Sequence, residues 1–176
     1  MMRSLLWSEK TVENPAVQVL LKNLESEYPI SKSGDGLPLT LRLEKNSKLH
    51  VEIKPHGITI IAPELSMIAR GIGIALSENS KAGFVVEECS PFKTRGIMLD
   101  CSRCAVMKPE YIKQWLRKLA LLGYNMLMLY TKDTYKLPGE EYFGYLRGAY
   151  TVAELQDIDR CAQQLGIEMV GAIQAL

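Results

Sequence analysis

The chain has 176 residues, of which 47% are hydrophobic, and its 21 basic and 20 acidic side chains give a formal net charge of +1. This size and composition exclude a disordered chain and suit one domain, or a small domain and part of another. The low net charge, with no basic run among aromatic residues, argues against a nucleic-acid partner. No apolar run reaches the roughly 20 residues of a membrane span, so we expect no membrane partner. The start of the chain lacks a signal-peptide pattern, and the four cysteines then indicate free thiols, so we predict a cytoplasmic protein.

Residues 1–90 have the pattern of a small α+β domain. A helical stripe over residues 15–28 starts with Asn14 as its cap and stops before Pro29. Alternating or apolar runs predict strands over residues 37–43, 49–54, 58–62 and 84–88, and a second helix over residues 63–76. The turn-forming sequence Ser90-Pro91-Phe92 marks the predicted boundary to a second domain, residues 91–176.

The second domain alternates strands and helices. Its predicted elements are a strand at 97–99, a helix at 109–122, a strand at 126–130, a loop at 131–149, a helix after Thr151 and a strand at 167–173. Pro109 suits a first helical turn, and Thr151 with Glu154 forms a capping box. The strands are apolar on both faces, which is typical of parallel sheets covered by helices on both sides.

This order predicts an α/β fold, namely a small α+β domain followed by the first three β/α elements of a (β/α)8 TIM barrel. A whole barrel of this type takes about 250 residues, so residues 91–176 are an incomplete barrel. The strand from Ile167 would then be an unpaired apolar edge, which favours self-association.

Polar residues follow each of the three predicted barrel strands. Because the carboxyl ends of parallel strands meet at one side of a sheet, we expect them to share one mouth. They include Asp100, Arg103, Asp133 and Gln174. The fixed donors of arginine, together with carboxylates and an amide, suit a polyhydroxylated ligand. The alternative is that Asp100 and Arg103 only pair with each other and cap their loop.

Cys101 and Cys104 form a CxxC sequence, which raises two sharper hypotheses. A thioredoxin-like dithiol also follows a strand, but the helix here begins only at Pro109, away from both thiols. A structural zinc site needs four ligands, and the sequence has no second CxxC and no HxxxH. We favour two ordinary free thiols, and we expect no metal and no cofactor.

Aromatic residues crowd the loop at 131–149 and its exit. They are Tyr135, Tyr142, Phe143, Tyr145 and Tyr150. Two interpretations are open: the rings stack on the apolar faces of sugar rings, or they anchor the loop by packing on one another.

The sequence RGIMLDCSR at residues 95–103 resembles the first barrel strand of family 20 glycoside hydrolases, the β-N-acetylhexosaminidases, which carry an RG-x-x-LD-x-SR pattern there. GYNMLMLYTKDTY, PGEEYFGYLRGAYT and LGIEMVGAIQ follow in the order expected of bacterial members. The preceding α+β region is similar to the small domain before the barrel in these enzymes. The resemblance covers nearly the whole chain, strongly from Arg95 onward.

The resemblance implies hydrolysis of a glycan that ends in β-linked N-acetylhexosamine. The reaction is retaining and substrate-assisted, because the 2-acetamido carbonyl attacks the anomeric carbon. Arg103 then matches the arginine that holds the hydroxyls of the terminal sugar, Asp100 supports that arginine, and Asp133 is a weaker match. Cys104 departs from the histidine or asparagine expected at its position.

A larger departure concerns catalysis. The family's Asp-Glu pair follows its fourth strand, and no Asp-Glu dipeptide occurs after Arg95 in this sequence. We therefore assign no catalytic residue and expect this chain, read as a truncated member, to be inactive alone. A non-catalytic carbohydrate-binding or interaction module and a dithiol redox protein remain as alternatives.

Overall fold

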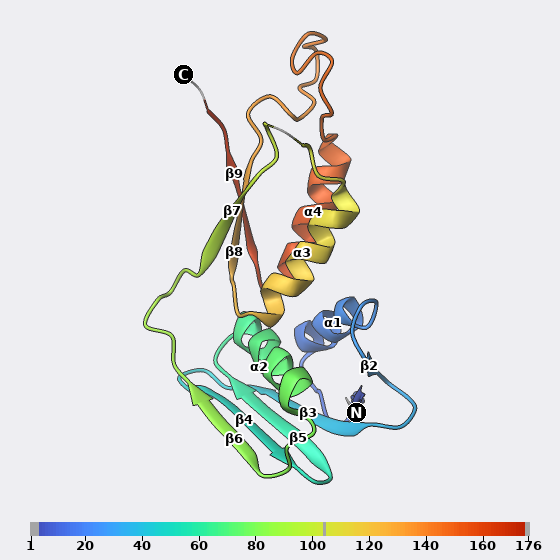
Figure 1. The fold of residues 1–176 in the computed structure, drawn as a ribbon, viewed down its shortest axis with the longest axis vertical. Coiled ribbons are helices and arrows are strands. Elements are labelled where there is room, and N and C mark those ends of the chain that lie inside the picture. The colour runs from blue at the N-terminus through green and yellow to red at the C-terminus, as the bar shows by residue number, and fades with distance from the viewer. Residues whose placement is uncertain (1–3, 104, 175–176) are drawn as a thin grey trace.

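A computed structural model describes residues 4–103 and 105–174 of the chain (Figure 1). In chain order its elements are β1 (Leu5–Leu6), α1 (Pro15–Leu24), β2 (Ile30–Ser31), β3 (Leu37–Leu43), β4 (Leu49–Lys54), β5 (Gly57–Ala62), α2 (Leu65–Glu78), β6 (Phe84–Glu88), β7 (Gly96–Asp100), α3 (Pro109–Leu121), β8 (Met126–Tyr130), α4 (Val152–Gln164) and β9 (Glu168–Ala172). Within these residues, no helix combines the length and the apolar character that crossing a membrane requires.

The first half of the chain forms a mixed sheet with α1 and α2 over one face (Figure 1). The strand order is β2-β1-β3-β5-β4-β6, with β3 parallel to β5 and β4 antiparallel to both β5 and β6. Alternate residues of β3 and β4 are buried, as the sequence pattern predicts for strands with one covered face. Asn14 caps α1 through its side chain, which accepts hydrogen bonds from the backbone of Ala16 and Val17.

The second half is a parallel sheet in the order β7-β8-β9, with α3 and α4 on one face (Figure 1). Leu127 and Leu129 of β8 are buried in the core. Met98, Met128 and Val170 lie side by side in register, and the Met98 side chain is 58% exposed. The expectation of helices on both faces is therefore wrong for the described residues, because both helices pack on the same face.

The two halves meet where α2 packs against α3. A Cβ atom placed on Gly73 of α2 would lie 2.2 Å from the backbone oxygen of Leu121, so the helices approach more closely than any side chain at that position allows. Gly71 similarly brings α2 onto the sheet, since its Cβ would lie 2.5 Å from Ile60 Cγ2. The buried apolar residues of both halves belong to one continuous core.

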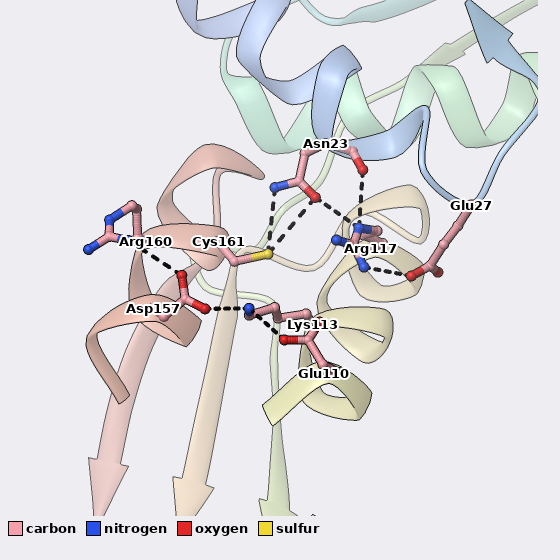
Figure 2. Close-up of polar contacts among 8 residues, drawn as sticks. All are labelled: Asn23, Glu27, Glu110, Lys113, Arg117, Asp157, Arg160 and Cys161. Carbon is pink, nitrogen blue, oxygen red and sulfur yellow. Dashed lines mark hydrogen bonds and ion pairs between the residues drawn. The ribbon is translucent and has the colours of Figure 1, made fainter. Parts of the chain in front are cut away.

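A polar joint beside this contact connects α1 to α3 and α4 (Figure 2). Arg117 Nε donates to the backbone oxygen and to Oδ1 of Asn23, and Arg117 Nη1 donates to Glu27 Oε1 at 2.5 Å. The Asn23 amide donates in turn to Gln164 Oε1 and to the buried Cys161 Sγ of α4. Both the oxygen and the nitrogen of the Asn23 side-chain amide therefore form hydrogen bonds across this joint.

Arg95 makes a second polar joint at the start of β7. Its Nη2 donates to Glu64 Oε1 at 2.6 Å and to Ser66 Oγ, both at the start of α2. Its Nε donates to the backbone oxygen of Gly123, which follows α3. Burial raises the pKa of Glu64, but hydrogen bonds from Ser66 and Arg95 outweigh this and leave that pKa below its ordinary value.

The structure departs from the predicted elements mainly near the amino terminus. The helix predicted over residues 15–28 ends at Leu24, and residues after it turn, with the Tyr28 amide donating to the Leu24 oxygen. This turn brings Ile30 beside Leu5 in the β1–β2 pair. Neither strand was predicted, because two residues are too few to show an alternating pattern. The second helix runs from Leu65 to Glu78 rather than over 63–76.

The close contact at Gly73 makes a testable prediction about stability. We expect Gly73→Ala to lower the free energy of unfolding by on the order of 1–2 kcal/mol, because forced separation of α2 and α3 outweighs the ~1 kcal/mol gain in helix propensity. Urea denaturation measures this change. Gly171→Ala, in strand β9, is the control for adding a Cβ without a close contact, since no atom lies within 4 Å of it. Equal or higher stability of Gly73→Ala would contradict the close contact.

Candidate functional site

The exit of β7 holds Asp100 in a defined position. Asp100 Oδ1 accepts hydrogen bonds from the backbone amide of Ser102 at 2.8 Å and from its hydroxyl at 2.7 Å. These bonds, with a smaller contribution from Arg103, hold the pKa of Asp100 below its ordinary value. Ser102 is buried, so the turn that presents the carboxylate is part of the packed structure. Asp100 is thus an oriented, ionised group at the end of the strand.

Arg103 lies next to this carboxylate and faces solvent. Its Nε lies 3.6 Å from Asp100 Oδ2, and its side chain is 69% exposed. The pairing that we considered as the alternative is therefore present. It is long and exposed, and exposed pairs of this kind contribute little to stability. A guanidinium held loosely at a strand exit retains donors that a ligand can use.

The other two predicted residues lie at the exits of β8 and β9 and have partners of their own. Gln174 Oε1 accepts a hydrogen bond of 2.6 Å from the Tyr130 hydroxyl, which connects the ends of those two strands. Asp133 Oδ1 accepts from Arg147 Nη1 at 2.8 Å, and this ion pair closes the base of the loop after β8. The structure thus brings Asp100 to Arg103 but pairs Asp133 with Arg147, a partner that sequence spacing did not indicate.

Two buried side chains, Thr134 and Tyr150, hold the backbone near the ends of β7 and β8 by hydrogen bonds. The Thr134 hydroxyl donates to the backbone oxygens of Cys101 at 3.0 Å and of Thr131 at 2.7 Å. The Tyr150 hydroxyl donates to the backbone oxygen of Met107 at 2.7 Å. Sequence reasoning missed the structural roles of Thr134 and Tyr150, since each acts on backbone about 33–43 positions away and no local pattern reports such a contact.

The geometry of Cys101 does not favour a dithiol site. Its side chain is fully buried, and burial raises the pKa of the thiol above its ordinary value. A reactive thiol needs the opposite, a lowered pKa and access to solvent. Cys104 lies outside the described residues. Within residues 4–103 and 105–174, no group of three or more His, Cys, Asp or Glu side chains is arranged to hold a metal ion.

The aromatic residues of the loop after β8 divide into two kinds. Tyr135 and Phe143 pack edge to face, with ring centroids 5.0 Å apart, and so anchor the loop on itself. Tyr142 and Tyr145 lie 6.1 Å apart and are 83% and 65% exposed. Self-anchoring, one of the two interpretations of this loop, thus describes the first pair, while the second pair is presented to solvent.

The environment of Asp100 makes a prediction about titration. Ser102→Ala removes one of the two short hydrogen bonds to Oδ1, so we expect the pKa of Asp100 to rise toward its ordinary value. Because that pKa is lowered in the folded chain, the associated stability is present above about pH 4 and is lost as the pH falls through the lowered pKa. NMR titration of the carboxyl carbon measures the shift, with Ser90→Ala as the control. An unchanged pKa in Ser102→Ala would contradict this environment.

Comparison with known proteins identifies solved structures that share this fold. No protein-family model matches the sequence, and no curated protein matches it. Solved structures do match. The exo β-N-acetylglucosaminidase of Vibrio harveyi, in complex with N-acetylglucosamine, superposes with a TM-score of 0.69 at 19% identity, covering 97% of this chain and 32% of that one.

Two further structures extend the comparison. A mutant β-hexosaminidase of Streptomyces plicatus, in complex with its product N-acetylglucosamine, has a TM-score of 0.68 at 22% identity and covers 97% of this chain and 42% of that one. The β-N-acetylhexosaminidase of Bacteroides fragilis has a TM-score of 0.66 at 16% identity, with coverage of 97% and 40%. At these identities the similarity establishes fold. The chain therefore has the fold of one part of the family 20 β-N-acetylhexosaminidases and spans about a third to two fifths of their length.

Proposed function

We propose that this chain is part of a β-N-acetylhexosaminidase and that it binds the terminal N-acetylhexosamine of a β-linked glycan. The observation that carries the proposal is the exit of β7, where the exposed Arg103 lies beside the oriented carboxylate of Asp100. These residues end the sequence pattern that resembles the first barrel strand of the family. The similar folds of enzymes solved with N-acetylglucosamine support the same ligand class.

The chemistry of the pair suits a sugar hydroxyl. A guanidinium offers several donors in a fixed plane, and two adjacent hydroxyls can each accept from it. Asp100 keeps the guanidinium near the strand end, and its remaining acceptor capacity can receive a hydroxyl proton. Gln174 and Tyr130 add a polar pair at the neighbouring exit, and Asp133 supports the site through the loop base.

We propose further that residues 91–176 are the first three β/α elements of a (β/α)8 barrel and that residues 1–90 form the small domain before it. The parallel sheet with helices on one face supports this reading, because a barrel keeps its helices outside and its strands inside. Retaining, substrate-assisted hydrolysis would then belong to the whole enzyme. The residues assigned here bind and orient the sugar, and none of them is placed as the acid that protonates the leaving oxygen.

The proposal predicts the behaviour of Arg103 variants. We expect the chain to bind N-acetylglucosamine and Arg103→Ala to weaken this binding roughly 10- to 100-fold, because hydrogen bonds to a charged group are lost. Arg103→Lys, which keeps the charge but not the planar donor set, should lie between the two. Isothermal titration measures the affinities, and Arg160→Ala, an equally exposed arginine of α4, is the control.

One outcome would contradict the proposed binding site, and another would contradict the expectation that the chain is inactive alone. Wild-type affinity in Arg103→Ala would remove Arg103 from the site. Turnover of a chromogenic N-acetylglucosaminide by the purified chain, if abolished in Arg103→Ala, would show that the chain is active by itself.

We also propose that the chain self-associates through its parallel sheet. In the described part of the chain, β7 and β9 each pair only with β8, so both edges of this sheet are open. The uncovered face carries Met98, 58% exposed, and Ile173 follows β9 at 59% exposure. Open edges beside an apolar face recruit further strands.

Met98→Glu tests this association. We expect light scattering to show an apparent mass that rises with concentration for the wild-type chain and rises less for Met98→Glu, because a charge on the edge strand β7 opposes pairing with a further strand. Val152→Glu, an exposed apolar position at the start of α4, is the control and should behave as wild type. A monodisperse wild-type monomer at high concentration would rule the association out.

A further inference from the structure

We propose that the loop between β8 and α4 carries a second sugar subsite, in which the rings of Tyr142 and Tyr145 bind the sugar that precedes the terminal N-acetylhexosamine. This inference rests on the proposed function and adds a second contact point on the glycan. It starts from two largely exposed aromatic rings, which lie within three positions of each other.

The base of the loop is closed by backbone and side-chain contacts. The amide of Tyr150 donates to the Thr134 oxygen at 3.0 Å, and the amide of Lys136 donates to the Tyr150 oxygen at 2.8 Å. The Asp133–Arg147 ion pair adds a side-chain closure. The two arms of the loop are therefore held together where they leave the sheet.

The middle of the loop is also constrained. A Cβ placed on Gly144 would lie 2.3 Å from the backbone oxygen of Asp133, so the returning arm lies directly against the outgoing one. Gly144 has a φ of +67°, which glycine adopts without strain. Leu146 has a φ of 59° and is 90% exposed, a conformation that is uncommon for leucine. A loop ordered before binding loses less conformational entropy when a ligand arrives.

Of the three aromatic rings at residues 142–145, one packs on the base of the loop and two are exposed to solvent. Phe143 packs on Tyr135, so the tip is tied to its own base. Its neighbours Tyr142 and Tyr145 make no comparable ring contact with that base, and their rings are tilted by 59° to each other at 6.1 Å. Such a pair offers two aromatic faces to one elongated ligand.

The chemistry around the rings favours a neutral, polyhydroxylated ligand. The apolar faces of pyranose rings pack on aromatic faces, while the phenol hydroxyls can donate and accept hydrogen bonds. Glu140 and Glu141, both exposed, add acceptors for sugar hydroxyls beside the rings. Within residues 140–147 the acidic Glu140 and Glu141 outnumber Arg147, which is paired with Asp133, so this stretch disfavours an acidic ligand.

The loop lies on the correct side of the sheet for this role. It leaves β8 after Tyr130, which is in register with Asp100 of β7. Figure 1 shows the loop extending beyond the same end of the sheet at which β7 and β9 finish. The loop and the exit of β7 therefore lie at the same end of the sheet, where two neighbouring sugars of one glycan would be bound.

Titration with two ligands tests the inference: N-acetylglucosamine and its β-linked disaccharide. We expect Tyr142→Ala and Tyr145→Ala each to weaken disaccharide binding roughly 2- to 10-fold and to leave monosaccharide binding unchanged, the size of one aromatic contact. Tyr142→Phe should bind the disaccharide more tightly than Tyr142→Ala, because the ring face is retained and only the hydroxyl is lost. Tyr111→Ala, which removes a half-exposed tyrosine from α3, is the control.

The possible failures are distinguishable. If both tyrosine variants bind the disaccharide as tightly as wild type while Arg103→Ala does not, the second subsite is wrong and the proposed function stands. If the wild-type chain binds neither sugar, both proposals fail. If the tyrosine variants lose self-association in light scattering with sugar binding unchanged, the tip is a protein contact and the inference is overturned.

Discussion

The close contact between α2 and α3 is the constraint on which the rest of this structure depends. Helices that carry ordinary side chains at a contact stay 8–10 Å apart, and closer approach requires a residue without a Cβ. Gly73 fills that position, and its surroundings leave no room for another atom. Through this contact the apolar interior of the mixed sheet continues into that of the parallel sheet. Two units that the sequence separates at residue 90 therefore share one core.

Polar side chains determine how the two units are oriented about that contact. Asn23 and Arg117 join α1 to α3, and Arg95 joins the start of β7 to the start of α2. Hydrogen bonds constrain direction as well as distance, so these joints limit rotation that apolar packing alone would permit. The Arg95 side chain, only 19% exposed, also reaches the backbone of Gly123. The direction of β7, and hence the position of Asp100 at its far end, is defined from both units.

The sequence pattern at residues 95–103 accordingly serves two purposes. Its first residue, Arg95, holds the unit in place, while Asp100 and Arg103 at its other end provide the polar groups of the candidate site. The five residues of β7 separate these functions by the length of one strand. A rigid scaffold at one end and exposed polar groups at the other is the arrangement expected of a binding site placed on a sheet. The pattern therefore carries a structural signal at one end and the residues of the proposed binding site at the other.

What the sequence by itself determined is the identity of the longer elements and the polar residues at the end of β7. The capping box at Thr151, the helix start at Pro109 and the alternation in β3 and β4 were all readable, because each arises from contacts within a few residues. The same local reasoning placed Asp100 and Arg103 together at the exit of β7. The tertiary structure alone decided that both helices of the parallel unit cover one face, that Asp133 pairs with Arg147, and that Tyr150 and Thr134 support the strand exits. Periodicity reports only whether a residue is buried, whereas the partner that buries it is chosen by how distant segments pack.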